Sequence, residues 1–348
     1  MKALIAMSGG VDSAVAAYLM KEQYECAGCT MRLRDVLCQD MEAGVLSDIE
    51  DARSVAQTIG IPFYVFDFRE HFQKHVIQSF VESYKEGLTP NPCIECNHYV
   101  KFGAFYEEGR KRGFDVIATG HYARIEKEGD LYLLKKGRDL LKDQSYVLYT
   151  LTQDQLAHTQ FPLGDLDKTE VRRIAEEKGF VNAHRRDSQD ICFVPDHDYA
   201  RIIEEQTGRR SEPGDFVDES GNVLGKHKGI IHYTVGQHRG LGLPTDIPLY
   251  VKQIDAKDNR IVLCENNGLF SNDVRAKSFN WISGTPEKNG KRGTAKIRYR
   301  HKEQPCTIYA EEDGTVSVRF DEPQRAATPG QSCVVYDGDV VLGGGIIL

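Results

Sequence analysis

Six consecutive residues near the start of the chain have the types and spacing needed to hold a phosphate group. The segment SGGVDS, residues 8–13, lies between an apolar strand-like run and an apolar helical run. Its two glycines let the backbone turn tightly, so that successive amide N–H groups and the positive end of the helix face one anion. The loop contains no lysine, which excludes a Walker A loop. The alternative is an ordinary glycine turn capped by Asp12 or Ser13.

Thiols in two segments are the next candidates for chemistry. Cys93 and Cys96 lie in NPCIECN, just after two prolines and before a predicted helix, where free amides and the helix dipole favour a thiolate. Cys192 lies in DSQDICF, close in sequence to Arg185 and Arg186. Both settings are typical of a nucleophilic cysteine.

Each of these thiols also has a plain structural interpretation. Cys93 and Cys96 have the spacing of half a zinc site, and Cys26 with Cys29 could supply the other half. However, Cys26 and Cys29 lie in a predicted strand, where residues three apart point to opposite faces. For Cys192 the corresponding interpretation is a small, buried apolar side chain.

The elements that must position these residues alternate between strand and helix. In the first third of the chain we predict strands at 2–7, 24–32, 63–68 and 115–119, with helices at 14–20, 51–58, 70–84 and 97–111. This alternation is typical of a doubly wound, mostly parallel α/β sheet that helices cover on both faces. The phosphate loop then follows the first strand of the sheet.

The pattern changes after the fourth strand. Residues 123–137 predict a hairpin and 168–178 a helix, whereas short alternating runs beyond residue 212, such as 229–235 and 296–300, predict mostly β structure. We therefore divide the chain into three domains. They are an α/β catalytic domain over 1–199, a small central domain over 200–272 and a β-barrel-like domain over 273–348.

Composition limits the class of protein. The 348 residues carry 44 basic and 52 acidic side chains, and 40% are hydrophobic, which disfavours a disordered chain. The N-terminal apolar run is too short for a signal peptide, and no stretch approaches the roughly 18 apolar residues of a membrane helix. We therefore expect a cytoplasmic protein with no membrane partner, in which the nine cysteines stay reduced.

Several further segments identify a family. They are NPCIECN, KFG, DVIATGHYAR, KDQSYVLYTL, DSQDICF, YTVGQHRGLG and KIRYR, in this order after SGGVDS. SGGVDS is the signature of the PP-loop ATP pyrophosphatases, and over its whole length the chain resembles the bacterial tRNA-specific 2-thiouridylases, the MnmA family. The resemblance implies an enzyme that adenylates the C2 oxygen of the wobble uridine of a tRNA with ATP and magnesium. Sulfur then replaces this oxygen, giving 2-thiouridine, AMP and pyrophosphate.

The resemblance also implies roles for two thiols. Cys192 would carry a persulfide received from a cysteine desulfurase or a sulfur relay protein. Cys96 would attack this persulfide and release sulfide, which leaves a transient disulfide between Cys96 and Cys192. Direct attack of the persulfide on the base, with Cys96 resolving the product, is the alternative.

Binding residues follow from the same resemblance, position by position. The implied ATP-binding residues are Ala6, Met7, Ser8, Gly9, Gly10, Val11, Asp12, Ser13, Met31 and Gly120, with magnesium near Asp12 and no structural metal. The implied contacts to tRNA and its target base are Asn91, Pro92, Cys93, His121, Lys142, Asp143, Gln144, Arg298, Tyr299 and Gln331.

Some of these residues have plain alternatives: a core methionine at Met31, a surface histidine at His121 and a solvated turn at 142–144. One departure concerns the loop after the second strand. There the chain has a single cysteine, Cys38, where relatives often have two, which weakens a metal interpretation of that loop.

Two other functions remain open on the sequence alone. Another PP-loop chemistry, such as an ATP-dependent amide ligase or a different RNA thiolase, would use the same phosphate loop. An amide ligase usually has an ammonia source such as a glutaminase, for which the chain has no convincing motif. The second is a non-catalytic, zinc-bearing RNA-binding protein.

The net charge of −8 sums over surfaces with different roles. Residues 288–302 carry no acidic side chain and seven basic ones, namely Lys288, Lys291, Arg292, Lys296, Arg298, Arg300 and Lys302. Because such a stripe releases counterions from RNA phosphates, we predict that tRNA binding weakens as salt rises from about 50 to 200 mM. Filter binding measures this, and equal affinity at both salt concentrations would contradict it.

Overall fold

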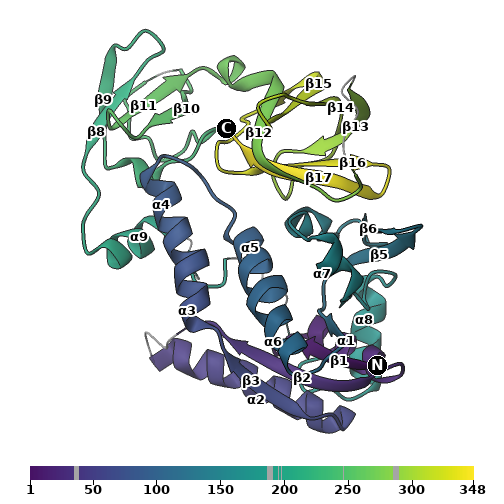
Figure 1. Cartoon of the computed structure of the whole chain (residues 1–348). Coiled ribbons are helices and arrows are strands. Elements are labelled where there is room, and N and C mark those ends of the chain that lie inside the picture. Colours follow the sequence, from purple (N-terminus) through teal and green to yellow (C-terminus); the bar gives the residue numbers. More distant parts are fainter. Residues whose placement is uncertain (35–38, 186–190, 195, 197, 246, 285–289) are drawn as a thin grey trace. The chain divides into compact units, whose positions relative to one another are not determined.

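The computed structural model describes residues 1–34, 39–185, 191–194, 196, 198–245, 247–284 and 290–348 (Figure 1). Cys38, Arg186 and Lys288 lie outside the described residues. The chain forms two compact units. The first comprises Met1–Val76, Cys93–Gln189 and Asp339–Val341, and the second comprises Ile77–Pro92, Asp190–Gly338 and Leu342–Leu348.

A parallel sheet forms the centre of the first unit and confirms the doubly wound α/β prediction. Its strands lie in the order β3-β2-β1-β4-β7, and every pair is parallel. The strands are β1 (Lys2–Ala6), β2 (Glu25–Arg32), β3 (Phe63–Asp67), β4 (Val116–Ala118) and β7 (Thr159–Gln160).

Helices cover both faces of this sheet because β1 is apolar on both faces. Ala3 and Ile5 belong to a core that also contains side chains of α1 (Val11–Lys21), α2 (Gln39–Ile59) and α8 (Lys168–Glu177). Leu4 faces the opposite side, where a Cβ on Gly109 would lie 3.3 Å from it. Gly109 is part of α6 (Tyr106–Lys111), so that helix packs closely on the second face.

Two helical segments of the first unit contain π-helical turns. One runs through α3 (Arg69–Phe72) into η1 (Gln73–Ile77), and the other runs from α5 (Pro92–Glu95) through η2 (Cys96–Phe105) into α6. The second helix begins five residues before the predicted start at 97, because proline is well suited to a first helical turn. Within the described ranges, every helix is too short or too polar to cross a membrane.

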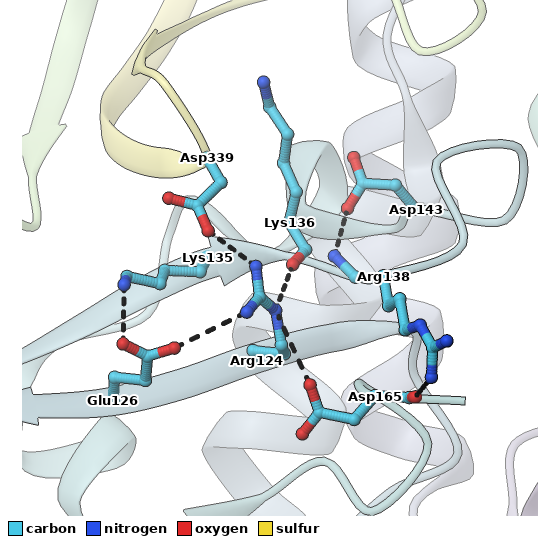
Figure 2. Close-up of polar contacts among 9 residues, drawn as sticks. Arg124, Glu126, Lys135, Lys136, Arg138, Asp143, Asp165 and Asp339 are labelled. Atoms are coloured by element: carbon cyan, nitrogen blue, oxygen red, sulfur yellow. Dashed lines mark hydrogen bonds and ion pairs between the residues drawn. The ribbon is translucent and has the colours of Figure 1, made fainter. Parts of the chain in front are cut away.

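The predicted hairpin is present as β5 (Ala123–Glu128) and β6 (Leu131–Lys136), which pair in antiparallel fashion. Figure 2 shows how Arg124 organises its surroundings: the guanidinium lies 2.6 Å from Asp339 and donates to the Lys136 carbonyl at 2.8 Å. Glu126 lies 3.5 Å from the same group. The backbone of residues 339–341 is thereby joined to the hairpin, where Val340 also pairs with Lys135. Shorter elements follow: η3 (Ser145–Leu148) and α7 (Gln153–Ala157).

The second unit contains α4 (Gln78–Lys85), α9 (Tyr199–Thr207) and a four-stranded sheet in the order β10-β11-β8-β9. These strands are β8 (Gly214–Val217), β9 (Val223–His227), β10 (Tyr250–Asp255) and β11 (Arg260–Cys264), and Phe216 lies fully buried in their core. The predicted strand at 229–235 is wrong. Gly229 adopts φ = 123°, and a short 3-10 turn, η4 (Ile230–His232), follows it.

Six antiparallel strands close into a barrel around their own core, which confirms the barrel-like prediction. They are β12 (Phe270–Trp281), β13 (Lys291–Lys296), β14 (Gln304–Ala310), β15 (Val316–Arg325), β16 (Ser332–Asp337) and β17 (Val340–Ile347); η5 (Asn266–Leu269) precedes them. The predicted strand at 296–300 is wrong, because β13 ends at Lys296 and a turn follows.

Candidate active site

The phosphate loop lies where the order of the parallel strands reverses. Chain order runs one way from β1 to β2 and β3, and the other way from β1 to β4, so a switch point lies at the carboxyl ends of β1 and β4. Open α/β sheets bind ligands at such a point. SGGVDS follows β1 and Gly120 follows β4. A Cβ on Gly120 would lie 2.9 Å from the carbonyl carbon of Asp12, so only glycine allows the loops to approach this closely.

No described side chain caps the start of α1, so the capped-turn alternative is wrong. The N-cap residue is Gly10, without a side-chain hydrogen bond. Ser13 Oγ instead donates to the Gly10 carbonyl at 2.9 Å and accepts from the Ser8 amide at 3.1 Å. The first amides of a helix have no intrahelical acceptor, so those of the first turn of α1 are suited to an anion.

The loop is held through its carbonyl groups. Asn182 Nδ2, which is buried, donates to the Gly9 carbonyl at 2.8 Å, and Arg185 donates to the same oxygen at 3.4 Å. Arg185 also forms ion pairs with Asp48 and, at 3.0 Å, with Asp51 of α2. Gly9 has φ = 76°, and a Cβ there would lie 2.5 Å from the Asp48 carbonyl oxygen. Sequence reasoning missed the role of Asn182.

A lysine that sequence reasoning also missed lies beside the loop. Lys168 Nζ is 2.6 Å from Asp12 Oδ1, and the Tyr122 hydroxyl donates to the same oxygen at 2.7 Å. The Lys168 side chain is only 11% exposed. Its backbone is fixed at the first turn of α8, which Asp167 caps through a capping box. The sequence did contain one relevant signal: Lys168 follows Asp167, the N-cap residue of α8, so its place at the start of a helix was predictable.

The remaining residues predicted to bind ATP lie at the ends of neighbouring strands. Ala6 and Met7 are buried, and the Met7 amide donates to the Cys29 carbonyl at 2.8 Å. Thr30 Oγ1 donates to the Met7 carbonyl at 2.7 Å, which fixes the backbone just before the loop. Met31 is half-buried near the carboxyl end of β2.

The thiols fall into two groups by exposure. Cys93 in α5 and Cys192 are exposed, and Cys96, the first residue of η2, is half-buried. Cys96 belongs to the first compact unit and Cys192 to the second. The buried group comprises Cys26, Cys29, Cys264, Cys306 and Cys333. Burial raises the pKa of Cys26 to about 11 and that of Cys29 to about 12, so these thiols stay protonated.

Among the described residues, no three His, Cys, Asp or Glu side chains are grouped so that they could hold a metal ion. Cys26 and Cys29 lie in β2 as predicted. Both belong to the buried thiols of the sheet.

His121 lies in the protein interior next to the switch point. Its Nδ1 is 2.7 Å from Thr119 Oγ1, and its Nε2 is 3.4 Å from Lys101 Nζ. Burial and the charge of Lys101 hold the pKa of His121 well below its usual value, so the ring is neutral. His121 is only 6% exposed, so the surface-histidine alternative is wrong.

Residues 142–144 form a fixed turn, so the solvated-turn alternative is wrong for Asp143 and Gln144. The Asp143 carboxylate accepts the Gly137 amide at 3.1 Å, a contact drawn in Figure 2, and the Ser145 hydroxyl at 2.9 Å. Gln144 Oε1 accepts the Tyr122 amide at 3.0 Å. Tyr122 therefore links this turn to Asp12 of the phosphate loop.

In the second unit, two predicted RNA-binding segments lie on turns. Arg298 and Tyr299 follow β13, and the Tyr299 side chain is 38% exposed. Gln331 Nε2 donates to the Thr89 carbonyl at 2.7 Å, and the Thr89 amide donates to the Pro329 carbonyl at 2.9 Å. Gln331 thus holds the segment that precedes half-buried Asn91 and buried Pro92.

The basic stripe is less uniform in space than in sequence. Arg292 forms a two-bond ion pair with Asp321, at 2.7 Å for each bond, and Lys291 lies 3.1 Å from Asp337. These partners come from β15 and β16, so a window of sequence does not reveal them. Arg300, like Tyr299, is exposed on the turn after β13.

Three known domain families match consecutive parts of the chain. The tRNA methyl transferase HUP domain matches residues 1–196, the tRNA methyl transferase PRC-barrel domain matches 202–265, and the aminomethyltransferase beta-barrel domain matches 271–347. The first match confirms the predicted α/β fold of the N-terminal part, and the other two agree with a central domain followed by a barrel.

Relatives are similar over the full length. The tRNA-specific 2-thiouridylase MnmA of Clostridioides difficile (strain 630) is 51% identical over 99% of this chain and 98% of its own. The protein of the same name from Acetivibrio thermocellus is 50% identical over 99% of both chains. Among solved structures, the U34-tRNA thiolase NcsA from Methanococcus maripaludis is 16% identical, covers 60% of this chain and 65% of its own, and has a TM-score of 0.37.

The division of thiols by exposure generates a prediction. A short pulse of iodoacetamide at pH 8 on the native protein should label Cys93 and Cys192 first and Cys96 more slowly, because only accessible thiolates react. The five buried cysteines should react only after addition of urea. Peptide mass mapping measures the labelling. Equal labelling of Cys29 and Cys192 in the native protein would contradict the assignment.

Proposed function

Since the chain belongs to the tRNA-specific 2-thiouridylase family, we propose that it converts the wobble uridine of a tRNA to 2-thiouridine. One observation carries the proposal: a phosphate loop with an uncapped helix start lies at the switch point of the sheet. The same chain has accessible thiols at Cys96 and Cys192. An adenylating site and a sulfur-carrying site are the two requirements of this reaction.

The phosphate loop performs the first step. The uridine O2 attacks the α-phosphorus of ATP, and the bond to the β-phosphate oxygen breaks, releasing pyrophosphate. The amides of α1 and the positive helix end stabilise the charge on the phosphates. Lys168 is placed to add a positive charge at the same position, because it already lies beside Asp12.

The thiols perform the second step. Cys192 receives a persulfide from a donor, which we expect to be a cysteine desulfurase or a sulfur relay protein. The Cys96 thiolate attacks the inner sulfur of this persulfide, so that hydrosulfide leaves and a disulfide forms. Hydrosulfide adds to C2 of the adenylated uridine and AMP departs. A dithiol reductant then restores both thiols for the next cycle.

Magnesium is expected to arrive bound to ATP. Asp12 fits as one carboxylate ligand, because an ATP-bound magnesium takes its other ligands from phosphate oxygens and water. Its Oδ1 already contacts Lys168 and Tyr122. The residues near the loop therefore suit a metal ion that is shared with ATP, and Lys168 limits the negative charge that Asp12 offers to it.

We assign the tRNA contacts to three places. Asn91, Pro92 and Cys93 would meet the target base. In the first unit, the turn at 142–144 would contact the tRNA, and His121 would act by positioning Lys101. Arg298, Tyr299 and Gln331 would contact the tRNA from the C-terminal domain.

We retain the division at 1–199, 200–272 and 273–348 as the proposed domains. The tRNA substrate also implies a cytoplasmic location.

The decisive assay supplies ATP, magnesium, a persulfide donor and unmodified tRNA, and detects 2-thiouridine and AMP by mass spectrometry. If the wild-type protein forms neither product, the proposed function is wrong. AMP formed with an acidic substrate and ammonia, without 2-thiouridine, would favour an amide ligase. Stoichiometric zinc that is lost with Cys96, without ATP turnover, would favour a zinc-bearing RNA-binding protein.

Single thiol variants test the two-thiol mechanism. Cys96→Ala and Cys192→Ala should each abolish 2-thiouridine formation from the persulfide donor, because each removes one sulfur centre that the transfer needs. Release of pyrophosphate in the first turnover should persist, since the phosphate loop is unchanged. Cys264→Ala, at a buried thiol outside the mechanism, is the control. Thiolation by either variant at near wild-type rate would exclude the mechanism.

A second pair of variants tests the phosphate role of Lys168. Lys168→Met should lower the rate of AMP formation about 10²- to 10³-fold, the usual effect of removing one donor to a developing anion. Lys178→Met is the matched control, because Lys178 lies at the other end of α8 against the Tyr18 ring. Thermal unfolding of both variants checks the fold. A rate within about twofold of wild type for Lys168→Met would exclude the role.

A further inference from the structure

We propose that a row of aromatic rings near Cys96 binds an unstacked base of the tRNA anticodon loop. The row, hereafter the aromatic row, consists of His71, His75, Tyr99 and His98. This inference rests on the proposed function and adds a binding site for its RNA substrate. The ligand class is a single-stranded nucleobase, recognised by its flat face.

One pair of rings in the aromatic row is stacked face to face, as neighbouring bases are. His75 and Tyr99 have ring centroids 4.5 Å apart and planes inclined by 18°. His98 meets Tyr99 edge-on, with centroids 4.3 Å apart and an interplanar angle of 80°. His71 follows His75 at 6.3 Å, and buried Phe68 supports it at 6.1 Å.

Both stacked rings lie in π-helical segments of the first unit. His75 is in η1, and Tyr99 is in η2, which Cys96 begins. In Figure 1 the helix that contains α3 runs beside the helix that contains α5 and α6, and the stacked rings connect the two. π-Helical turns are rare and occur frequently at functional sites. Tyr99 follows Cys96 by three residues, so a base bound there would lie near the thiol.

Exposure distinguishes the aromatic row from a packing core. The Tyr99 side chain is 39% exposed and His71 is exposed, whereas the neighbouring core rings Phe72 and Phe102 are fully buried. A ring that served only to fill the core would be buried like the phenylalanines. Tyrosine and histidine at the surface are the types on which RNA-binding proteins stack unpaired bases.

Charge around the aromatic row suits a base with its phosphate. Burial and the charges of Lys74 and His71 lower the pKa of His75, so this ring is neutral at neutral pH. Lys74 is exposed next to His75, where it can meet a phosphate. Glu95, the nearest acidic residue in η2's helix, has a pKa raised by burial. The aromatic row therefore offers a neutral His75 ring beside the positive charge of Lys74.

The test uses full-length protein and an unmodified tRNA that carries 2-aminopurine next to the wobble uridine. Tyr99→Ala should weaken tRNA binding about 5- to 150-fold, the range that corresponds to loss of one base–aromatic stack. It should also reduce the quenching of 2-aminopurine. Tyr99→Phe keeps the ring and should bind within about twofold of wild type. Tyr64→Ala removes a tyrosine of equal exposure, 40%, outside the aromatic row, and serves as the control.

Each outcome decides the proposal. Wild-type affinity of Tyr99→Ala would overturn it, and so would equal losses in Tyr99→Ala and Tyr99→Phe, since the hydroxyl would then be the contact. If Tyr99→Ala does not fold, Tyr99→Leu keeps the packing against His75 without an aromatic face and should lose the same affinity. If the wild type makes no 2-thiouridine, the proposed function itself is wrong. If the wild type makes 2-thiouridine but Tyr99→Ala binds tRNA as tightly as the wild type, only the base-binding proposal is wrong.

Discussion

A loop that binds an anion through its amides must be fixed by its other groups, and this constraint shapes the first compact unit. The first-turn amides of α1 are left for a ligand, so the backbone is secured through carbonyl oxygens. Thr30 binds the carbonyl of Met7, Asn182 binds that of Gly9 and Ser13 binds that of Gly10. Thr30 lies in β2, Ser13 lies in α1 and Asn182 follows α8. Several parts of the sheet and its helices are therefore needed to hold one short loop.

The same constraint explains the charges around the loop. Lys168 and Arg185 both carry positive charge near the loop, and these charges repel each other unless carboxylates neutralise them. Asp12 pairs with Lys168, and Asp48 and Asp51 pair with Arg185. The positive groups are therefore already ordered and partly neutralised before a ligand arrives, which reduces the reorganisation that binding requires.

Local signals in the sequence were sufficient for the α/β sheet, for the position of the loop after its first strand and for the change from α/β to β structure. They failed where a residue acts through a partner far along the chain. Lys168 lies 156 residues after Asp12, and Asn182 lies 173 residues after Gly9, so no pattern of spacing connects them. The strand predicted at 229–235 failed for another reason: its apolar pattern is suited to a strand, but the positive φ of Gly229 turns the backbone away. Assignments of RNA contacts still depend on family resemblance.

Residues 339–341 give the first unit a distinctive order of assembly during protein synthesis. Asp339 meets Arg124, which precedes it by 215 residues, so a ribosome needs roughly 10–40 s to produce the partner after the hairpin has emerged. Throughout that interval the nascent hairpin carries Arg124 without this carboxylate and lacks the pairing of Lys135 with Val340. A chain that ends within the barrel would therefore lack both of these contacts, and its first unit would be incomplete.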